Sequence, residues 1–573
     1  MINKWIYSEL TEEQTQLKEK LTNELSISPI LSKLLLQRDI KTFDEARAFF
    51  RPSLTDLYDP FLMADMDKAV NRLTVAMQNN EKILVYGDYD VDGTTSVSLV
   101  YKYLSKFYSN LDFYIPDRYT EGYGVSYIGI DYAFDNNFGL IIALDCGIKA
   151  VEKVKYAAGK GIDFIICDHH TPDIELPPAV AVLDPKRDDC NYPYKHLSGC
   201  GVGFKLMQAF SQANNIEFNQ LTPLLDLVAL SVASDIVPIT GENRIMTFYG
   251  LRQLNSNPSM GIKAIIDVCG LKDREITISD IVFKIGPRIN ASGRMKQGKE
   301  AVQLLVANNY EDAFKKGNTI NIYNNDRKDL DKSITDQALN FINSDPIFKT
   351  RKSIVIYNSD WHKGVIGIVA SRLSEEFYKP TIVLTESNGF ASGSARSVSG
   401  FDIYKAIETC RDLLENFGGH MYAAGLTLKI ENVEEFSRCF EKAVAESIAE
   451  GQTYPQIDID AVLQFKDITP KFIRILKQFA PFGPGNMKPI FESKRVFDYN
   501  DSSRLVGKEQ EHLKLELIDN SSENVMSGIA FKMYEYNDHL KALNPLDICY
   551  TLDENTFNGT TTTQLTIRDI KRV

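Results

Sequence analysis

The sequence predicts an α/β protein in which a parallel-sheet domain and a second α/β domain are joined by a long helix and followed by a small β-barrel. Three observations support this fold class: the length of 573 residues, an alternation of short apolar runs with helical segments, and a turn-rich C-terminal part with period-two hydrophobicity. At roughly 150 residues per domain, the chain has room for about three or four folded units.

The parallel sheet is predicted by four short apolar runs between residues 82 and 167. Each run is short enough to be a strand buried on both faces, and the segments between them, such as Val151–Gly159, have the length of crossover helices. Such sheets bind their ligands beyond the carboxyl ends of the strands, so we expect the chemistry at that edge. The runs are Lys82–Tyr86, Leu111–Ile115, Leu140–Leu144 and Phe164–Cys167, with a helix opening near Thr94.

A polar stretch from about Asn309 to Asp345 carries apolar residues at spacings that favour one long helix. It is the best candidate for a connection between two domains. A second α/β unit then begins at Ser353–Tyr357 and includes Thr381–Thr385. After it, Pro481-Phe-Gly-Pro-Gly485 is too rich in proline and glycine to be a helix or a central strand.

The C-terminal part predicts a small β-barrel. Leu513, Leu515 and Leu517 face one way and the charged residues between them face the other, which is the pattern of a half-buried strand. Asn558-Gly559 stands between two β-rich runs, and this pair is a strong hairpin signal. The barrel resembles an OB-fold, whose groove binds single strands through basic tracks and stacked aromatic side chains.

Composition excludes several classes of protein. A formal net charge of −13 argues against a protein that binds nucleic acid through its overall charge. A polyanionic ligand must therefore be bound by local basic patches or by metal ions. The longest apolar stretch is interrupted by aspartates and is too short for a membrane span. With no apolar signal segment at the N-terminus and eight scattered cysteines, we expect a cytoplasmic protein with reduced thiols and no membrane partner.

Acidic and histidine residues cluster where the predicted elements end. A single Asp-x-Asp is common in loops, and a strand-end aspartate often only caps a helix, but four clusters in one domain favour a metal site. Crowded carboxylates repel each other unless a cation lies among them, and mixed Asp and His ligands suit Mn²⁺, Mg²⁺ or Fe. Two such ions would clamp a phosphate and activate a water. The residues are Asp88, Asp90, Asp92, Asp145, Asp168, His169, His170 and Asp235.

These clusters resemble the four motifs of the DHH phosphoesterase superfamily. The motifs are Asp88-Tyr-Asp-Val-Asp-Gly93, Asp145-Cys-Gly147, Asp168-His-His170 and Ser234-Asp235. Further along, Gly418-Gly-His-Met-Tyr-Ala-Ala-Gly425 resembles the signature of the DHH-associated domain. Gly286-Pro-Arg-Ile-Asn-Ala-Ser-Gly-Arg294 narrows the resemblance to the RecJ exonucleases, and the resemblance extends from about residue 45 to the end of the chain.

The resemblance implies a single-stranded-DNA-specific exonuclease of DNA repair and recombination that degrades from 5′ to 3′, releases mononucleotides and needs two ions of Mn²⁺ or Mg²⁺. One position departs from the superfamily: the pyrophosphatase branch has a metal-binding histidine where this chain has Tyr86, and we expect Asp88 to compensate. The implied ligands are Asp90, Asp92, Asp145, His169 and Asp235, with Asp145 bridging both ions and with Asp88 and His170 in or beside the same shell.

Substrate contacts are expected outside the metal cluster. The resemblance implies that Arg118, Ser394 and Arg396 hold the 5′-terminal phosphate and that His420 belongs to the active site. Arg118 alone fits a surface charge equally well. Residues 392–397 are small and include one arginine, so we expect a phosphate-binding loop there.

Five basic residues between Lys284 and Lys299 include Arg288 and Arg294. A run of charges usually marks a solvated face, but the glycine and asparagine residues of this stretch favour a loop that contacts phosphate. We expect both arginines to bind the substrate.

We expect an N-terminal helical segment, a DHH catalytic domain, a connecting helix, a DHH-associated domain and an OB-like nucleic-acid-binding domain. Two alternatives remain open: a DHH phosphodiesterase acting on short oligonucleotides or cyclic dinucleotides, and a non-catalytic DNA-binding replication factor. The expected partners are single-stranded DNA with a 5′ end, single-strand-binding protein and a helicase, and we expect a monomer. The expected segments are residues 1–48, 49–308, 309–345, 346–453 and 454–573.

Overall fold

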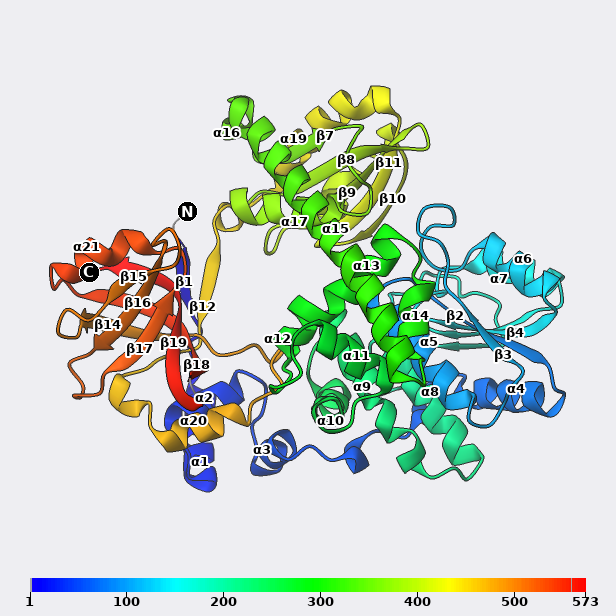
Figure 1. The fold of residues 1–573 in the computed structure, drawn as a ribbon, viewed down its shortest axis with the longest axis horizontal. Helices are drawn as coiled ribbons and strands as arrows, with labels where there is room; N and C mark the ends of the chain where they lie inside the picture. The colour runs from blue at the N-terminus through cyan, green and yellow to red at the C-terminus, as the bar shows by residue number, and fades with distance from the viewer. Residues whose placement is uncertain (1–2, 558) are drawn as a thin grey trace. The chain divides into compact units, whose positions relative to one another are not determined.

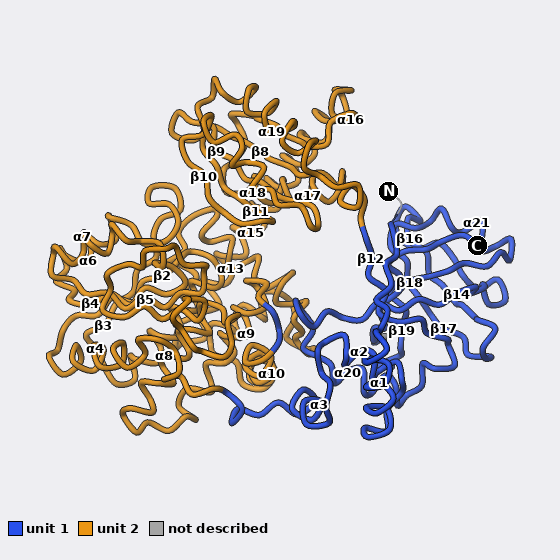
Figure 2. The backbone as a smooth tube through the Cα atoms, turned by 180° about the vertical axis from the view of Figure 1, so that it is seen from behind, with its two compact units in different colours: residues 1–57, 238–240, 456–573 blue, residues 58–237, 241–455 orange. Residues whose placement is uncertain are grey.

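The computed structural model describes residues 3–557 and 559–573, which form two compact units (Figure 2). One unit comprises residues 1–57, 238–240 and 456–573, and the other comprises residues 58–237 and 241–455. The larger unit contains both α/β domains, and the smaller contains the barrel. The predicted fold class is therefore confirmed.

The first α/β domain is built on a five-stranded parallel sheet (Figure 1). Its strand order is β3-β2-β4-β5-β6, and every neighbouring pair is parallel. All carboxyl ends therefore meet at one edge of the sheet. The strands are β2 (Lys82–Gly87), β3 (Leu111–Tyr114), β4 (Phe138–Leu144), β5 (Asp163–Cys167) and β6 (Ala181–Leu183).

Helices cover both faces of this sheet. On one face, strand residues such as Leu84 and Ile141 share an apolar cluster with α6 and α7. On the other face, Leu144 and Val100 of α5 lie against Gly203 of α8. The prediction that a helix opens near Thr94 is wrong by three residues, because Oδ1 of Asp90 caps the helix by accepting from the backbone N–H of Gly93 at 3.0 Å. The helices are α4 (Met66–Gln78), α5 (Val91–Leu104), α6 (Tyr127–Asp135), α7 (Val151–Gly159) and α8 (Gly199–Ala213).

The basic stretch that begins at Lys284 is helical as far as Met295, and only residues 296–298 form a short connection, so the prediction of a loop is wrong for most of it. Ile281, Ile285 and Ile289 are all fully buried at a spacing of four, and Pro287 stands in the first turn of a helix, where proline is tolerated. Helices continue through the rest of the domain: α9 (Leu225–Ser234), α10 (Gly241–Ser256), α11 (Met260–Val268), α12 (Ile278–Asp280), a π-helical turn (Ile281–Ile285), α13 (Gly286–Met295) and α14 (Lys299–Leu305).

A single helix of 35 residues, α15 (Tyr310–Ser344), links the two α/β domains as predicted. The second domain has a mixed sheet in the order β10-β11-β9-β8-β7, in which only β7 and β8 are parallel. Its strands are β7 (Ile354–Tyr357), β8 (Thr381–Ser387), β9 (Phe390–Arg396), β10 (Leu414–His420) and β11 (Ala423–Leu428), and its helices are α16 (Ile347–Thr350), α17 (Ile366–Phe377), α18 (Ile403–Glu408) and α19 (Val433–Ser447).

Residues 392–396 lie in β9, so the prediction of a phosphate-binding loop there is wrong. β9 is the central strand of the second sheet and pairs with β8 on one side and β11 on the other. Ala391 and Ala395 point into the apolar core of the domain. The small side chains of this segment allow close packing within the sheet. From composition alone, the same small residues predict a flexible loop.

The smaller unit contains a seven-stranded sheet that closes on itself through an additional pairing between β14 and β16. Leu513, Leu515 and Leu517 are fully buried, as predicted. The predicted hairpin is formed by β18 and β19, although Asn558 itself lies outside the described residues. The strands are β13 (Ala461–Val462), β14 (Phe491–Asp498), β15 (Arg504–Val506), β16 (His512–Ile518), β17 (Met526–Ala530), β18 (Leu546–Phe557) and β19 (Thr560–Arg572), with helices α20 (Pro470–Lys477) and α21 (Asn537–Lys541).

The N-terminal segment belongs to the barrel unit and is not a separate helical stretch. Leu31 and Leu34 share an apolar core with Phe465, Phe479 and Phe491 of the barrel. The segment also begins with a strand, β1 (Lys4–Tyr7), which pairs in parallel with β12 (Gln456–Ile459). Its helices are α1 (Glu12–Leu25), α2 (Pro29–Leu36) and α3 (Phe43–Phe50).

Two further findings concern the cysteines and the apolar character of the helices. All eight cysteines are free thiols, and six of them are buried. None of the helices within the described residues is both long and apolar enough to cross a bilayer.

Candidate active site

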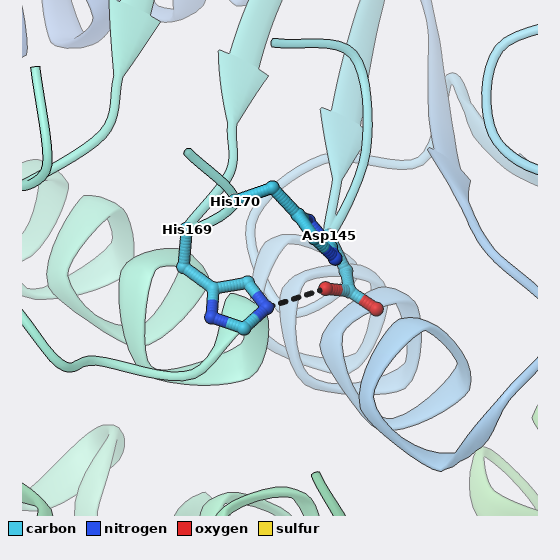
Figure 3. A group of neighbouring side chains, drawn as sticks. All are labelled: Asp145, His169 and His170. Atoms are coloured by element: carbon cyan, nitrogen blue, oxygen red, sulfur yellow. Dashed lines mark ion pairs between the residues drawn. The ribbon is translucent and has the colours of Figure 1, made fainter. Parts of the chain in front are cut away.

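The carboxyl edge of the first sheet gathers the predicted metal ligands. Nε2 of His169, which follows β5, lies 3.2 Å from Oδ1 of Asp145, which follows β4 (Figure 3). The same nitrogen lies 3.5 Å from Oδ2 of Asp235 and 3.7 Å from Oδ2 of Asp92. Donor atoms of Asp92, His169 and Asp235 lie within 4.8 Å of one another, as do those of Asp145, His169 and His170.

Asp145 is held in an unusual backbone conformation. Its φ is 58°, in the left-handed region, and its backbone N–H donates to the carbonyl of Cys167 at 2.9 Å. A Cβ added to Gly199 would stand 2.5 Å from the Cβ of Asp145. The carboxylate is therefore positioned by the end of β5 on one side and by the start of α8 on the other.

Asp92 is anchored at the N-terminus of α8. Its carboxylate accepts hydrogen bonds from the backbone N–H groups of Gly199 at 2.7 Å and Cys200 at 2.8 Å, and from the hydroxyl of Ser231 at 2.7 Å. The first N–H groups of a helix stabilise a negative charge. These three hydrogen bonds therefore hold the buried carboxylate of Asp92 in a fixed position.

Asp88 and Asp90 come from the turn between β2 and α5. Oδ1 of Asp88 accepts from the N–H of Gly124 at 3.2 Å, while Oδ2 is buried without a protein partner. Tyr86 lies in the core: its hydroxyl donates to the carbonyl of Gly124 at 3.0 Å, and its ring stacks on Tyr114. This tyrosine therefore packs under the site and offers no ligand to it.

Asp168 belongs to the predicted acidic clusters as the acid of the Asp-His-His motif, but no role in the site is predicted for it. Oδ1 of Asp168 lies 2.7 Å from Nδ1 of His170, and the carboxylate also accepts from the N–H groups of Ile148 and His169. Burial alone would lower the pKa of His170, but the bond to Asp168 outweighs it and raises that pKa to about 9. The same contacts, against the effect of burial, lower the pKa of Asp168.

The remaining carboxyls show the electrostatics of a cation site. Burial, followed by repulsion from neighbouring aspartates, raises the pKa values of Asp88, Asp145 and Asp235 well above the usual range, and that of Asp90 is also raised. Burial lowers the pKa of His169 to about 4, so its imidazole is neutral near pH 7.

The unpartnered atoms fit a metal ion. Oδ1 of Asp145 and both ring nitrogens of His169 are buried and have no hydrogen-bond partner. Buried polar groups are normally paired, so an unpaired Oδ1 of Asp145 beside an unpaired Nε2 of His169 is explained by a cation between them. Carboxylate oxygens with one imidazole suit Mn²⁺ or Mg²⁺.

Arginines from both α/β domains interact with one another. Arg294 on α13 donates to the carbonyl of Gly364 in the second domain at 3.2 Å, and its own carbonyl accepts from the hydroxyl of Tyr119. Burial and the charges of Arg118 and Arg396 lower the pKa of Arg294 to about 10. Positive charges gathered in this way form a site suited to an anion.

Arg396 is oriented by the second sheet. Its guanidinium donates to the hydroxyls of Ser371 at 3.1 Å and Ser394 at 2.9 Å. A Cβ on Gly367, at the start of α17, would stand 3.0 Å from its NH2. Burial and the charge of Arg118 lower its pKa.

Two other predicted residues lie in different environments. His420 is the last residue of β10, and partial burial of its ring, followed by the charges of Arg396 and His170, lowers its pKa. Arg288 donates to Oδ1 of Asn321 on α15 at 2.9 Å and to the carbonyl of Lys284 at 2.8 Å. Its guanidinium therefore fastens α13 to α15.

Sequence reasoning missed two residues besides Asp168. Gly199 is required by the close approach of Asp145, and Tyr123 places its hydroxyl 3.3 Å from Nε2 of His170. Neither residue belongs to the four acidic clusters. The one sequence signal is that Tyr123 lies five residues after Arg118, which is itself a predicted substrate contact.

Comparisons with known families cover most of the chain. Residues 82–232 match the DHH family, N-terminal domain, residues 351–446 match the DHHA1 domain, and residues 459–569 match the RecJ OB domain. The crystal structure of RecJ in complex with Mn²⁺ from Thermus thermophilus has a TM-score of 0.85 at 23% identity, with 100% of this chain and 80% of that one covered. A crystal structure of exonuclease RecJ bound to manganese has a TM-score of 0.59 at 26% identity, covering 70% of this chain and 100% of that one.

Curated relatives share the same name. The single-stranded-DNA-specific exonuclease RecJ of Bacillus subtilis is 36% identical over 96% of this chain and 69% of its own length. The protein of that name from Escherichia coli is 31% identical over 98% of this chain and 99% of its own length. With the three domains in order and the acidic edge intact, the chain belongs to the RecJ family.

Proposed function

We propose that the chain is a single-stranded-DNA-specific exonuclease of DNA repair and recombination that hydrolyses phosphodiester bonds from 5′ to 3′ and releases mononucleotides. The observation that carries the proposal is the set of buried, unpartnered ligand atoms on Asp145 and His169 at the sheet edge. The names of its RecJ relatives support the substrate class.

We assign two ions of Mn²⁺ or Mg²⁺ to the acidic edge. When bound, the ions would offset the carboxylate charge, hold the scissile phosphate and lower the pKa of an attacking water. Asp145 interacts with Asp90, Asp92 and Asp235, so we assign it to both ions. The ligands we propose are Asp90, Asp92, Asp145, His169 and Asp235.

The surrounding residues prepare these ligands. The start of α8 holds Asp92 in place through backbone N–H groups, and the low pKa of His169 leaves one ring nitrogen with a lone pair available for coordination. His170, which Asp168 keeps protonated near neutral pH, presents a positive charge that can stabilise a charged phosphate. Asp88 lies behind this group and interacts with Asp90.

We assign the 5′-terminal phosphate to Arg118, Arg294, Ser394, Arg396 and His420. Burial and the charge of Arg118 lower the pKa values of both Arg294 and Arg396, which supports an anion at this point, and a bidentate guanidinium recognises a terminal phosphate well. An anchor at a fixed place beside the metal cluster would set the polarity, because cleavage would always occur one nucleotide from the bound end. Arg288 would act through the packing of α13 against α15.

The proposal extends to the partners. A helicase would supply single strands by unwinding a duplex, and single-strand-binding protein would present them. We further propose that the protein acts as a monomer in the cytoplasm and that the OB domain provides a second surface for the strand.

Digestion of end-labelled single strands, with and without a 5′ phosphate, tests the proposal. In Mn²⁺, the intact protein should release labelled mononucleotides from the 5′ end, and Asp145→Ala should release none. Arg396→Ala should lose the preference for a 5′ phosphate. A substrate length series excludes an enzyme of short oligonucleotides if long strands are degraded at least as well. Release from the 3′ end, or full activity in Asp145→Ala, would contradict the assignment.

A further inference from the structure

Ser231 on α9 contacts two of the candidate metal ligands. Its side chain is fully buried, and its hydroxyl donates to Oδ1 of Asp92 at 2.7 Å. Its backbone carbonyl accepts from the N–H of Asp235 at 2.9 Å, about one helical turn further along the chain. The hydroxyl oxygen also lies 2.6 Å from that of Ser198, the N-cap of α8. Ser231 therefore links α8 and α9 to the carboxylate of Asp92, which comes from α5.

The two carboxylate oxygens of Asp92 have different numbers of partners. Oδ1 accepts short hydrogen bonds from the hydroxyl of Ser231 and from the backbone N–H of Cys200 at 2.8 Å. Within the described part of the chain, Oδ2 accepts one hydrogen bond, from the N–H of Gly199 at 2.7 Å, and it lies 3.7 Å from Nε2 of His169. Each carboxylate oxygen has two lone pairs. Both lone pairs of Oδ1 are therefore engaged, while Oδ2 keeps one for a cation.

The number of oxygens that a carboxylate offers affects which ion it binds. Ca²⁺ takes about six to eight oxygen ligands and can receive both oxygens of one carboxylate, whereas Mg²⁺ is smaller and requires a near-ideal octahedron. Mn²⁺ also suits octahedral oxygen sites. A carboxylate that is limited to one oxygen fits the smaller ions and provides one ligand fewer for Ca²⁺.

We propose that Ser231 is a positioning residue that gives the metal site a preference for Mg²⁺ and Mn²⁺ over Ca²⁺. By engaging Oδ1, its hydroxyl limits Asp92 to a single ligand atom, Oδ2. The inference rests on the proposed function, because it assumes the metal site, and it concerns the choice of ion. Groups that hydrogen-bond to a metal ligand orient that ligand, and their loss typically costs about 10- to 100-fold in metal affinity.

The test measures metal binding by the whole chain in the absence of DNA. Protein freed of metal with EDTA and then dialysed is loaded with Mn²⁺ and titrated with Ca²⁺, and the electron paramagnetic resonance signal of free Mn²⁺ reports its release. Calorimetric titrations give the Kd of each ion. Ser231→Ala should weaken Mn²⁺ binding about 10-fold, because Asp92 is less well oriented, and should leave the Kd of Ca²⁺ within about twofold. The ratio of the Ca²⁺ Kd to the Mn²⁺ Kd should therefore fall about 5- to 20-fold.

Ser211→Ala is the matched control. Ser211 on α8 is also buried, and its hydroxyl donates to the carbonyl of Met207 at 2.6 Å and lies 2.6 Å from that of Tyr103. Neither partner is a candidate ligand, so this variant should lose stability in EDTA without a change in the ratio of the Kd values.

A second variant acts on the same hydroxyl from another helix. Ser198→Ala removes the neighbour that lies 2.6 Å from the hydroxyl of Ser231, which can then rotate away from Asp92. The ratio of the Kd values should fall in this variant as well, by about 2- to 5-fold. This measurement decides the inference if Ser231→Ala does not fold.

The ratio of the Kd values separates the outcomes. An equal loss of affinity for both ions would make Ser231 a structural residue and overturn the inference, as would unchanged affinities for both. If the wild-type protein binds neither ion, the proposed function fails, and the inference fails with it. If the wild-type protein binds Mn²⁺ but does not digest single strands, only the proposed function fails.

Discussion

Gly199 lies directly against the side chain of Asp145: a Cβ added to Gly199 would stand 2.5 Å from the Cβ of Asp145 and 2.7 Å from its Oδ1. The N–H of the same glycine donates to Asp92 at 2.7 Å. One residue thus positions two candidate ligands, Asp92 from the first turn of α5 and Asp145 from the end of β4. The absence of a side chain at this point is what allows the two carboxylates to approach each other.

Gly199→Ala should therefore disable the site. The added methyl group must displace Asp145 or the start of α8, and a displacement of about 1 Å in a catalytic group can cost about 100-fold in rate. We expect kcat/KM in Mn²⁺ to fall at least about 100-fold. Gly159→Ala is the control, since nothing lies within 4 Å of its Cβ position, and it should retain activity. Near-normal activity in Gly199→Ala would contradict this account.

Asp145→Asn should separate stability from metal binding. Burial and neighbouring aspartates raise the pKa of Asp145, so its charge is unfavourable in the metal-free protein. In EDTA at pH 8, we expect the variant to be more stable than wild type, because the neutral amide does not carry the unfavourable charge. Added Mn²⁺ should raise the melting temperature of wild type but not of the variant. Calorimetry checks both points, and a variant less stable than wild type in EDTA would disprove the first.

The pair of Asp168 and His170 should make the stability of the metal-free protein depend on pH. The pKa of His170 is raised to about 9, above an unfolded value of about 6.5. Its contribution is therefore fully present below about pH 6.5 and is lost as the pH rises through 9. The pKa of Asp168 is lowered, so its contribution is present above about pH 3.9 and is lost at lower pH.

Urea unfolding in EDTA between pH 5 and pH 10 measures this dependence. Asp168→Asn should lower the free energy of unfolding more at pH 6 than at pH 10. A difference that stays constant over this range would show that the pair does not titrate as described.

Leu34→Ala should weaken the barrel. Leu34 on α2 is fully buried in the core that contains Phe465 and Phe491. Removing a buried leucine side chain costs about 2–5 kcal/mol. Hydrogen exchange should therefore accelerate in β16 and β18, while β4 of the larger unit stays protected. Phe43→Ala, at a residue that is 47% exposed, is the control and should change exchange little.

The site was predictable to a large extent because a parallel sheet brings strand ends together. Asp88, Asp145 and His169 each follow a buried apolar run, so the topology alone places them at one edge. Gly199 was not predictable from such a pattern. Its importance arises from a distance between two backbones, and no local spacing reports that distance.

The wrong predictions have a common physical cause. Residues 284–299 and 392–397 are rich in small or polar residues, which predicts loops, but Ile285, Ile289 and Ala395 are buried, and residues 284–295 are helical and 392–396 form a strand. Tertiary packing outweighs local propensity at such positions. The apolar face of α2 likewise predicts that this helix is covered by other residues. The pattern does not predict which residues cover it, and those of the barrel lie more than 400 residues away in the chain.

The two strands β1 and β12 belong to the same unit although almost the whole nuclease core is encoded between them. During synthesis on the ribosome, residues 3–57 emerge first and must wait for residues 456–573 before they can complete their fold. Throughout that delay Leu31, Leu34 and Leu35 have no apolar partner from the barrel, so the nascent chain is a natural client for a holding chaperone.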